Sequence, residues 1–196
     1  MNSVSAGLRR LLKYAAWCGG SLTALTAVIV SVDVTLRKAF NTTLGGADEL
    51  AGFALAISSA WAFGFALERR AHVRIDLVHG WLPVRLRAAL DLVAIGTLTL
   101  FAGVLAWRAY GVFADSLRLD SHTMSAMATP LALPQFFWAA GMIAFVLTGT
   151  VLLSRAMLAF IRGDYEATQR QIGALTVREH IESDSPPTQD SKEPSP

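Results

Sequence analysis

The chain has 196 residues, of which 53% are hydrophobic and only 16% are charged. Soluble domains carry about 25% charged residues, so this composition argues against an ordinary soluble domain. A single cysteine excludes an intrachain disulfide and a cysteine-rich metal site. The formal charge of +2 gives no indication of a nucleic-acid partner, and none is expected.

Four uncharged apolar blocks predict an all-α membrane protein with four transmembrane helices. Each block is close to the roughly 20 residues that a helix needs to cross a bilayer. Four segments cannot close a barrel, and backbone polar groups inside lipid must be satisfied within the protein, so helices are the expected form. The predicted spans are 11–36, 48–68, 84–113 and 131–160.

The first block begins like a secretory signal peptide, because Arg9, Arg10 and Lys13 precede it. It is longer than the roughly 7–15 apolar residues of such a peptide. Trp17, directly before Cys18, does not suit a lipoprotein cleavage site. We therefore expect an uncleaved first helix.

Basic residues are distributed unequally between the two sides of the predicted bundle. With a cytoplasmic N-terminus, the inner side receives most of them, and the positive-inside rule then places both termini in the cytoplasm. The outer connections lie near 37–48 and 114–130, and the inner one near 69–83. The inner residues are Arg9, Arg10, Lys13, Arg69, Arg70, Arg74, Arg85, Arg87, Arg155, Arg162 and Arg170.

The inner connection itself has an amphipathic pattern. Apolar residues recur there at helical spacing, and arginines share another face, which predicts an interfacial amphipathic helix in addition to the four spans. The apolar positions are Val73, Leu77 and Trp81, and the basic ones are Arg70 and Arg74.

Composition changes near the end of the fourth span. We expect residues 1–161 to form the transmembrane domain and 162–196 to be a polar, largely disordered cytoplasmic tail. Its end, 183–196, is rich in Pro, Ser and Asp and has too few apolar residues to fold. The nearer part, 165–181, leaves room for a short helix.

No catalytic, cofactor-binding or metal-binding residue is predicted. The four histidines (His72, His79, His122 and His180) all lie outside the apolar blocks, which disfavours a haem-bearing anchor. No ionisable residue lies inside a block, whereas an intramembrane charge is the usual mark of an ion path. Arg108, which directly follows the third block, is placed near the membrane boundary. We expect no enzymatic activity and no solute transport by this chain alone.

Small residues form a ridge along the second predicted helix. Gly52, Ala56, Ala60 and Gly64 recur at every fourth position. Small residues allow close approach of another helix, and van der Waals contact drives association in lipid. The ridge fits packing within the bundle or against a partner chain, and both remain open.

Two acidic residues lie near the outer ends of predicted helices. Asp33 and Arg37 are four apart, a spacing that predicts an ion pair on one helix face. Glu49 lies at the start of the second helix, where it complements the helix dipole. Both are interpreted as structural.

The order of these features resembles the small membrane subunits of tripartite ATP-independent periplasmic (TRAP) transporters, the DctQ-like family. The resemblance covers about 10–160. It is carried by Glu49 at the start of the second helix, by Trp61 and Gly64, by the stretch ERRAHVRIDL at 68–77 with Arg70, His72, Arg74 and Asp76, and by TPLALPQ at 129–135.

This resemblance implies a small scaffold subunit in a bacterial inner membrane, beside a large membrane subunit that carries the substrate and ion sites. A soluble periplasmic binding protein would deliver an organic anion, such as a carboxylate, for symport driven by a cation gradient, typically of Na⁺. Arg70 and Arg74 would face anionic lipids or partner carboxylates. Two alternatives are an oxidoreductase membrane anchor and a free-standing oligomer joined through the Gly52–Gly64 ridge.

The spacing of His72 and Asp76 generates a prediction. The two are four apart and can hydrogen-bond across one helical turn, whereas topology alone needs only the arginines. We expect the double variant His72→Ala, Asp76→Ala, with Arg70 and Arg74 intact, to lose co-purification with the large subunit. Normal co-purification would contradict the assignment of these two residues to assembly.

Overall fold

The computed structural model describes residues 3–69, 83–125 and 127–172, and within them the chain is helical. The helices are α1 (Ser3–Phe40), α2 (Ala47–Glu68), α3 (Val84–Arg118), α4 (Ala132–Ile161) and α5 (Tyr165–Ile172). Four of these described helices are long and apolar enough to cross a membrane. The prediction of an all-α chain with four such helices is confirmed. The predicted interfacial helix lies almost wholly outside the described residues.

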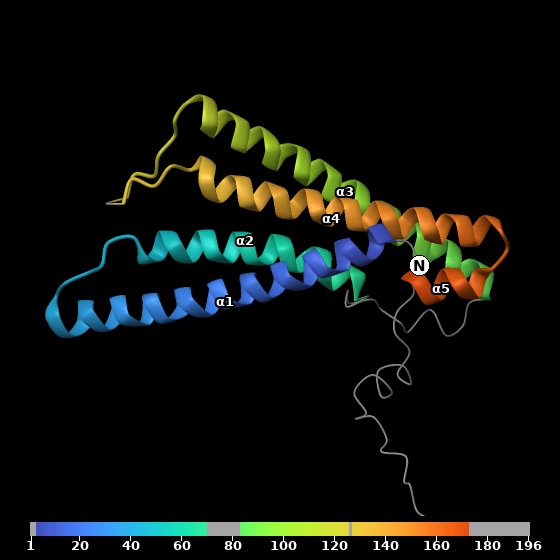
Figure 1. Cartoon of the computed structure of the whole chain (residues 1–196), viewed down its shortest axis with the longest axis horizontal. Coiled ribbons are helices and arrows are strands. Elements are labelled where there is room, and N and C mark those ends of the chain that lie inside the picture. The colour runs from blue at the N-terminus through green and yellow to red at the C-terminus, as the bar shows by residue number, and fades with distance from the viewer. Residues whose placement is uncertain (1–2, 70–82, 126, 173–196) are drawn as a thin grey trace, which may run out of the picture.

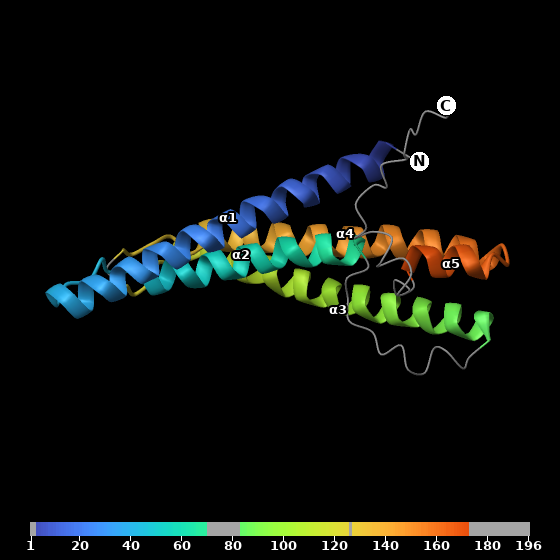
Figure 2. The same ribbon diagram turned by 90° about the horizontal axis from the view of Figure 1, so that it is seen from below.

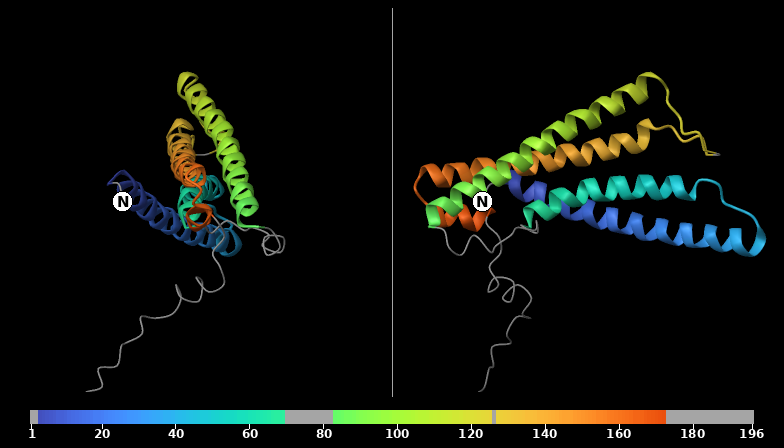
Figure 3. Two further views of the ribbon diagram at one scale, coloured as in Figure 1. Left: turned by 90° about the vertical axis from the view of Figure 1, so that its right-hand side faces the viewer. Right: turned by 180° about the vertical axis from the view of Figure 1, so that it is seen from behind.

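Two antiparallel hairpins build the bundle. α1 packs on α2, α3 packs on α4, and the hairpins meet where α2 runs beside α4 (Figure 1). α1 and α3 lie on opposite sides of this central pair (Figures 2 and 3). The α1–α2 and α3–α4 connections share one end of the molecule, and α5 lies at the other. We call the first of these the outer end, following the predicted topology.

The helices α2 and α4 match the predicted spans closely, but α1 and α3 are longer. The predicted limits followed charge, and Arg, Lys and Leu are good helix formers that do not stop a helix. With 38 residues, α1 is about 57 Å long, against a bilayer core of about 30 Å. Such a helix must tilt or project beyond the bilayer.

Glycine positions bring the helix backbones close together. A Cβ atom added to Gly141 of α4 would lie 2.9 Å from the Ala60 Cβ of α2, and one added to Gly19 of α1 would lie 3.1 Å from the Ser58 Cα. Such distances are too short for ordinary packing, so these sites accept only glycine unless the neighbouring helix shifts. Close approach of this kind is how helices associate in lipid.

Hydrogen bonds reinforce the same contacts. The Ser58 hydroxyl donates to the carbonyl oxygen of Gly19 (2.7 Å), and Thr23 donates to Ser58 Oγ (2.9 Å). Towards α4, the indole Nε1 of Trp61 donates to the carbonyl oxygen of Phe137 (3.1 Å). α2 is therefore bonded to α1 and to α4.

The short helix α5 folds back onto α3 and α4. Asp164 caps it by accepting a hydrogen bond from the Ala167 amide (2.9 Å). Thr168 and Ile172 are buried, and Tyr165 receives the Arg85 guanidinium over its ring at 5.4 Å. The first part of the predicted tail is thus packed on the bundle, and residues 173–196 lie outside the described structure.

The Gly141 contact generates a stability prediction. We expect Gly141→Ala to lower the free energy of unfolding by about 1–3 kcal/mol, because the added methyl overlaps Ala60. Gly103→Ala is the matched control, since no atom lies within 4 Å of a Cβ there and both variants gain the same helix propensity. Thermal unfolding in detergent measures the difference, and equal stabilities would contradict the close contact.

Candidate functional site at the outer end

The structure describes only two of the six family-motif residues. Glu49 lies in the first turn of α2, and Gly64 lies near its inner end. The remaining motif residues, Arg70, His72, Arg74 and Asp76, lie outside the described residues. The geometry of the candidate site therefore begins with Glu49.

The Glu49 carboxylate connects the two hairpins. Its Oε2 accepts a hydrogen bond from the Ser125 hydroxyl, which belongs to the connection between α3 and α4. Ser125 Oγ also lies 3.1 Å from Thr123 Oγ1 in the same connection. The helix-dipole interpretation of Glu49 is therefore incomplete, because its side chain holds a loop from the other hairpin.

That loop is also closed by its own hydrogen bonds. The amide of Thr123 donates to the carbonyl oxygen of Thr129 (3.0 Å), and the amide of Thr129 donates to Thr123 Oγ1 (2.9 Å). Leu131 donates to the carbonyl oxygen of Ser121 (2.9 Å), which brings the end of the loop back to its start. Glu49 thus holds a loop whose described residues are already ordered by these bonds.

Gly46 makes a second contact between the outer connections. It directly precedes α2 and has φ +113°, a conformation that L side chains rarely adopt. A Cβ at this position would also overlap the Met127 side chain of the α3–α4 connection. Glycine adopts this φ without strain and leaves room for the Met127 side chain.

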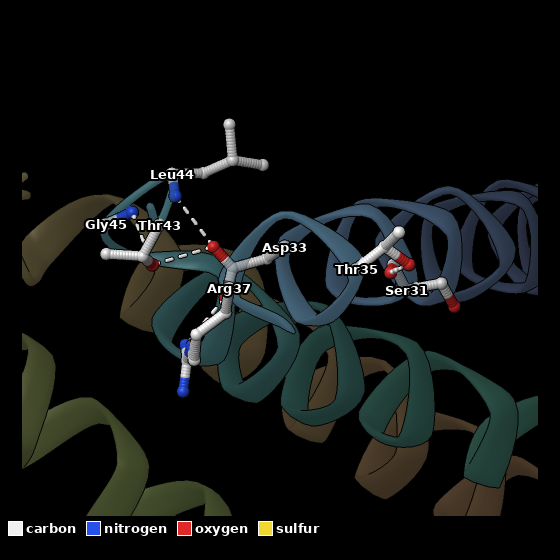
Figure 4. A network of polar contacts seen from close by, with 7 residues as sticks. All are labelled: Ser31, Asp33, Thr35, Arg37, Thr43, Leu44 and Gly45. Atoms are coloured by element: carbon white, nitrogen blue, oxygen red, sulfur yellow. Dashed lines mark hydrogen bonds and ion pairs between the residues drawn. The ribbon is translucent and has the colours of Figure 1, made fainter. Parts of the chain in front are cut away.

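Asp33 organises the first outer connection (Figure 4). Asp33 is 1% exposed, and its carboxylate accepts hydrogen bonds from Arg37 (2.6 Å), the Thr43 hydroxyl (2.7 Å) and the Leu44 amide (2.7 Å). The predicted pairing with Arg37 is confirmed. A buried carboxylate needs such donors, and here they fold the connection back over the end of α1.

The small-residue ridge of α2 has two different environments. Ala60 is 1% exposed against Gly141, and Gly64 is buried against Leu12 and Phe145. Towards the outer end, Ala56 is half-buried, and Gly52 is exposed with no atom within 4 Å of a Cβ. Packing within the bundle uses the inner half of the ridge and leaves Gly52 open.

Several residues of this site were not found from the sequence. Ser125 and Thr43 are loop hydroxyls, which are common and carry no spacing signal. The adjacent Gly45 and Gly46 do signal a turn, but not the contact with Met127. Within 3–69, 83–125 and 127–172, no group of three or more His, Cys, Asp or Glu side chains is placed to hold a metal ion.

The Glu49–Ser125 bond generates a second stability prediction. We expect Glu49→Ala to lower the free energy of unfolding by about 1–3 kcal/mol and to speed hydrogen exchange in 121–131, because Ser125 loses its acceptor. Asp48→Ala is the matched control, since it removes a neighbouring acidic charge from the same first turn.

Adding Ser125→Ala to Glu49→Ala should then lower the free energy of unfolding little further, because the two residues act as a pair. If Asp48→Ala and Glu49→Ala had equal effects on unfolding and exchange, the helix-dipole interpretation would suffice.

The comparison with known families bears on this geometry. No curated protein and no solved structure matches the chain. The family described as tripartite ATP-independent periplasmic transporters, DctQ component, matches residues 26–159, which include α2, α3, both outer connections, most of α4 and the outer part of α1. The chain therefore belongs to the DctQ family and is a small membrane subunit of a TRAP transporter.

Proposed function

We propose that this subunit is a stationary scaffold that supports the large membrane subunit while the large subunit moves its cargo. The observation that carries this proposal is the close contact between helices, both within the first hairpin and between the two hairpins. Gly19 meets Ser58 between α1 and α2, and Gly141 meets Ala60 between α2 and α4. Packed interiors of this kind resist continuous deformation, which suits a brace.

The buried hydroxyls of the spans support the same role. Thr26 donates to the carbonyl oxygen of Leu22 (2.7 Å), and Thr148 donates to that of Ala144 (2.8 Å). Each hydroxyl proton is thus used by the preceding turn of its own helix. These groups are poorly placed to coordinate a passing solute.

The proposal extends to the partners and the energy source. A large membrane subunit would carry the substrate and ion sites, and a periplasmic binding protein would bring an organic anion, such as a carboxylate. A cation gradient, typically of Na⁺, would drive symport. The chain would lie in a bacterial inner membrane with both termini cytoplasmic, and its inner basic residues would contact anionic lipids.

Reconstitution in liposomes tests this division of labour. We expect this chain alone to accumulate none of a panel of radiolabelled carboxylates under an inward Na⁺ gradient. The chain with the large subunit and the binding protein should accumulate one of them. Vesicles that hold the large subunit and binding protein without this chain are the control and should be inactive. Accumulation by the chain alone would refute the scaffold role.

A further inference from the structure

Arg108 lies at an unexpected depth in the bundle. Its neighbours on α3, Ala106 and Ala109, belong to one buried cluster with Ala60 of α2 and with Ala139 and Met142 of α4. The Arg108 side chain itself is exposed on the outward face of α3. It therefore lies at the level of this cluster, on the side that faces away from α4.

The length of α2 locates that level in the membrane. α2 has 22 residues and is about 33 Å long, which is close to the bilayer core of about 30 Å. Ala60 lies roughly two turns or more from either end of α2. Arg108 is also roughly three turns before the end of α3 at Arg118.

This position differs from the sequence-based placement of Arg108 near the membrane boundary. That placement assumed that the third apolar block is centred in the membrane like the others. We infer a deeper position from the packing register, because the residues of α3 beside Arg108 cluster with Ala139 and Met142, which lie roughly two to three turns inside the outer end of α4. Neighbouring helices, rather than the block itself, set the depth.

The described part of the chain does not neutralise this arginine. Its guanidinium lies over the Trp107 ring, 5.4 Å from the centroid. None of the acidic side chains that the structure describes lies within ion-pair distance of it. A charge facing lipid roughly two to three turns inside the neighbouring helix is unfavourable, and charged side chains within spans almost always face a cavity or a partner.

A groove adjoins Arg108 on the same helix. Its volume is about 470 Å³, and Trp107 forms part of its wall. Gly103 also lines it, and no atom lies within 4 Å of a Cβ at this glycine or at Gly111, one turn beyond Trp107. The backbone of α3 is thus open to close approach by another helix beside the arginine.

We propose that this face of α3 receives a transmembrane helix of the large membrane subunit, and that a carboxylate on that helix pairs with Arg108. The proposal rests on the scaffold function proposed above. Charge complementarity selects the partner, because an acidic side chain can pair bidentately with a guanidinium. Lipid tails offer this guanidinium neither a negative charge nor a hydrogen-bond acceptor. We name this surface, formed by Arg108, Trp107, Gly103 and Gly111, the α3 docking face.

Substitution of the arginine tests the docking face. We expect Arg108→Leu to weaken association with the large subunit by about 30-fold or more, measured by co-purification in detergent. Arg108→Lys keeps the charge, so more of the complex should co-purify with this variant than with Arg108→Leu. Arg118→Leu removes a charge from the outer end of the same helix and should leave recovery unchanged. Wild-type recovery with Arg108→Leu would overturn the proposal.

The isolated chain provides an independent readout. Because Arg108 has no acidic partner in the described part of this chain, we expect Arg108→Leu alone to unfold at the same temperature as the wild type or higher. A lower unfolding temperature would mean that the arginine acts within its own subunit, and would overturn the docking face.

Photo-crosslinking then identifies the neighbour. With benzoylphenylalanine at position 107, irradiation of the complex should join this chain to a helix of the large subunit that carries an acidic residue. If the complex co-purifies but this crosslinked product does not form, the docking face is overturned and the scaffold function is not. Failure of the wild-type chain to bind the large subunit at all would instead refute the scaffold function, so the two failures are distinguishable.

Discussion

The absence of a hydrophobic driving force between helices in lipid is the constraint on which the rest of this structure depends. Lipid tails are as apolar as leucine, so the helices associate through close van der Waals contact and interhelical hydrogen bonds. Gly141 against Ala60 and Gly19 against Ser58 supply the contact, and Trp61 adds a bond to a main-chain carbonyl. α2 and α4 take the centre of the bundle because they carry these positions.

The outer end uses polar chemistry for the same purpose. Glu49 joins the start of α2 to the connection between α3 and α4, and Asp33 folds the other connection over the end of α1. Each carboxylate accepts hydrogen bonds from loop groups that would otherwise depend on water. The hairpins are thereby held at their outer end as well as along the helices, which supports the scaffold function that we propose.

Arg108 would give the proposed scaffold a defined attachment face. The buried hydroxyls of Thr26 and Thr148 bond their own helices, whereas α3 presents an exposed cation beside Ala106 and Ala109. A scaffold needs a definite attachment face, and a charge inside an apolar surface specifies position and partner more sharply than apolar contact does. The open backbone at Gly103 lies on the same helix.

The sequence by itself determined the number of long apolar helices and their approximate limits, because uncharged blocks of span length have only one stable form in lipid. It also indicated the family through Glu49, Gly64 and the motif around His72. It missed Ser125 as the partner of Glu49, because contacts across many residues leave no local spacing pattern. Only the tertiary structure decided that Gly52 stays open while Ala60 is buried, and that the neighbours of Arg108 pack against Ala139 and Met142, because exposure and contacts are set by the register in which neighbouring helices pack.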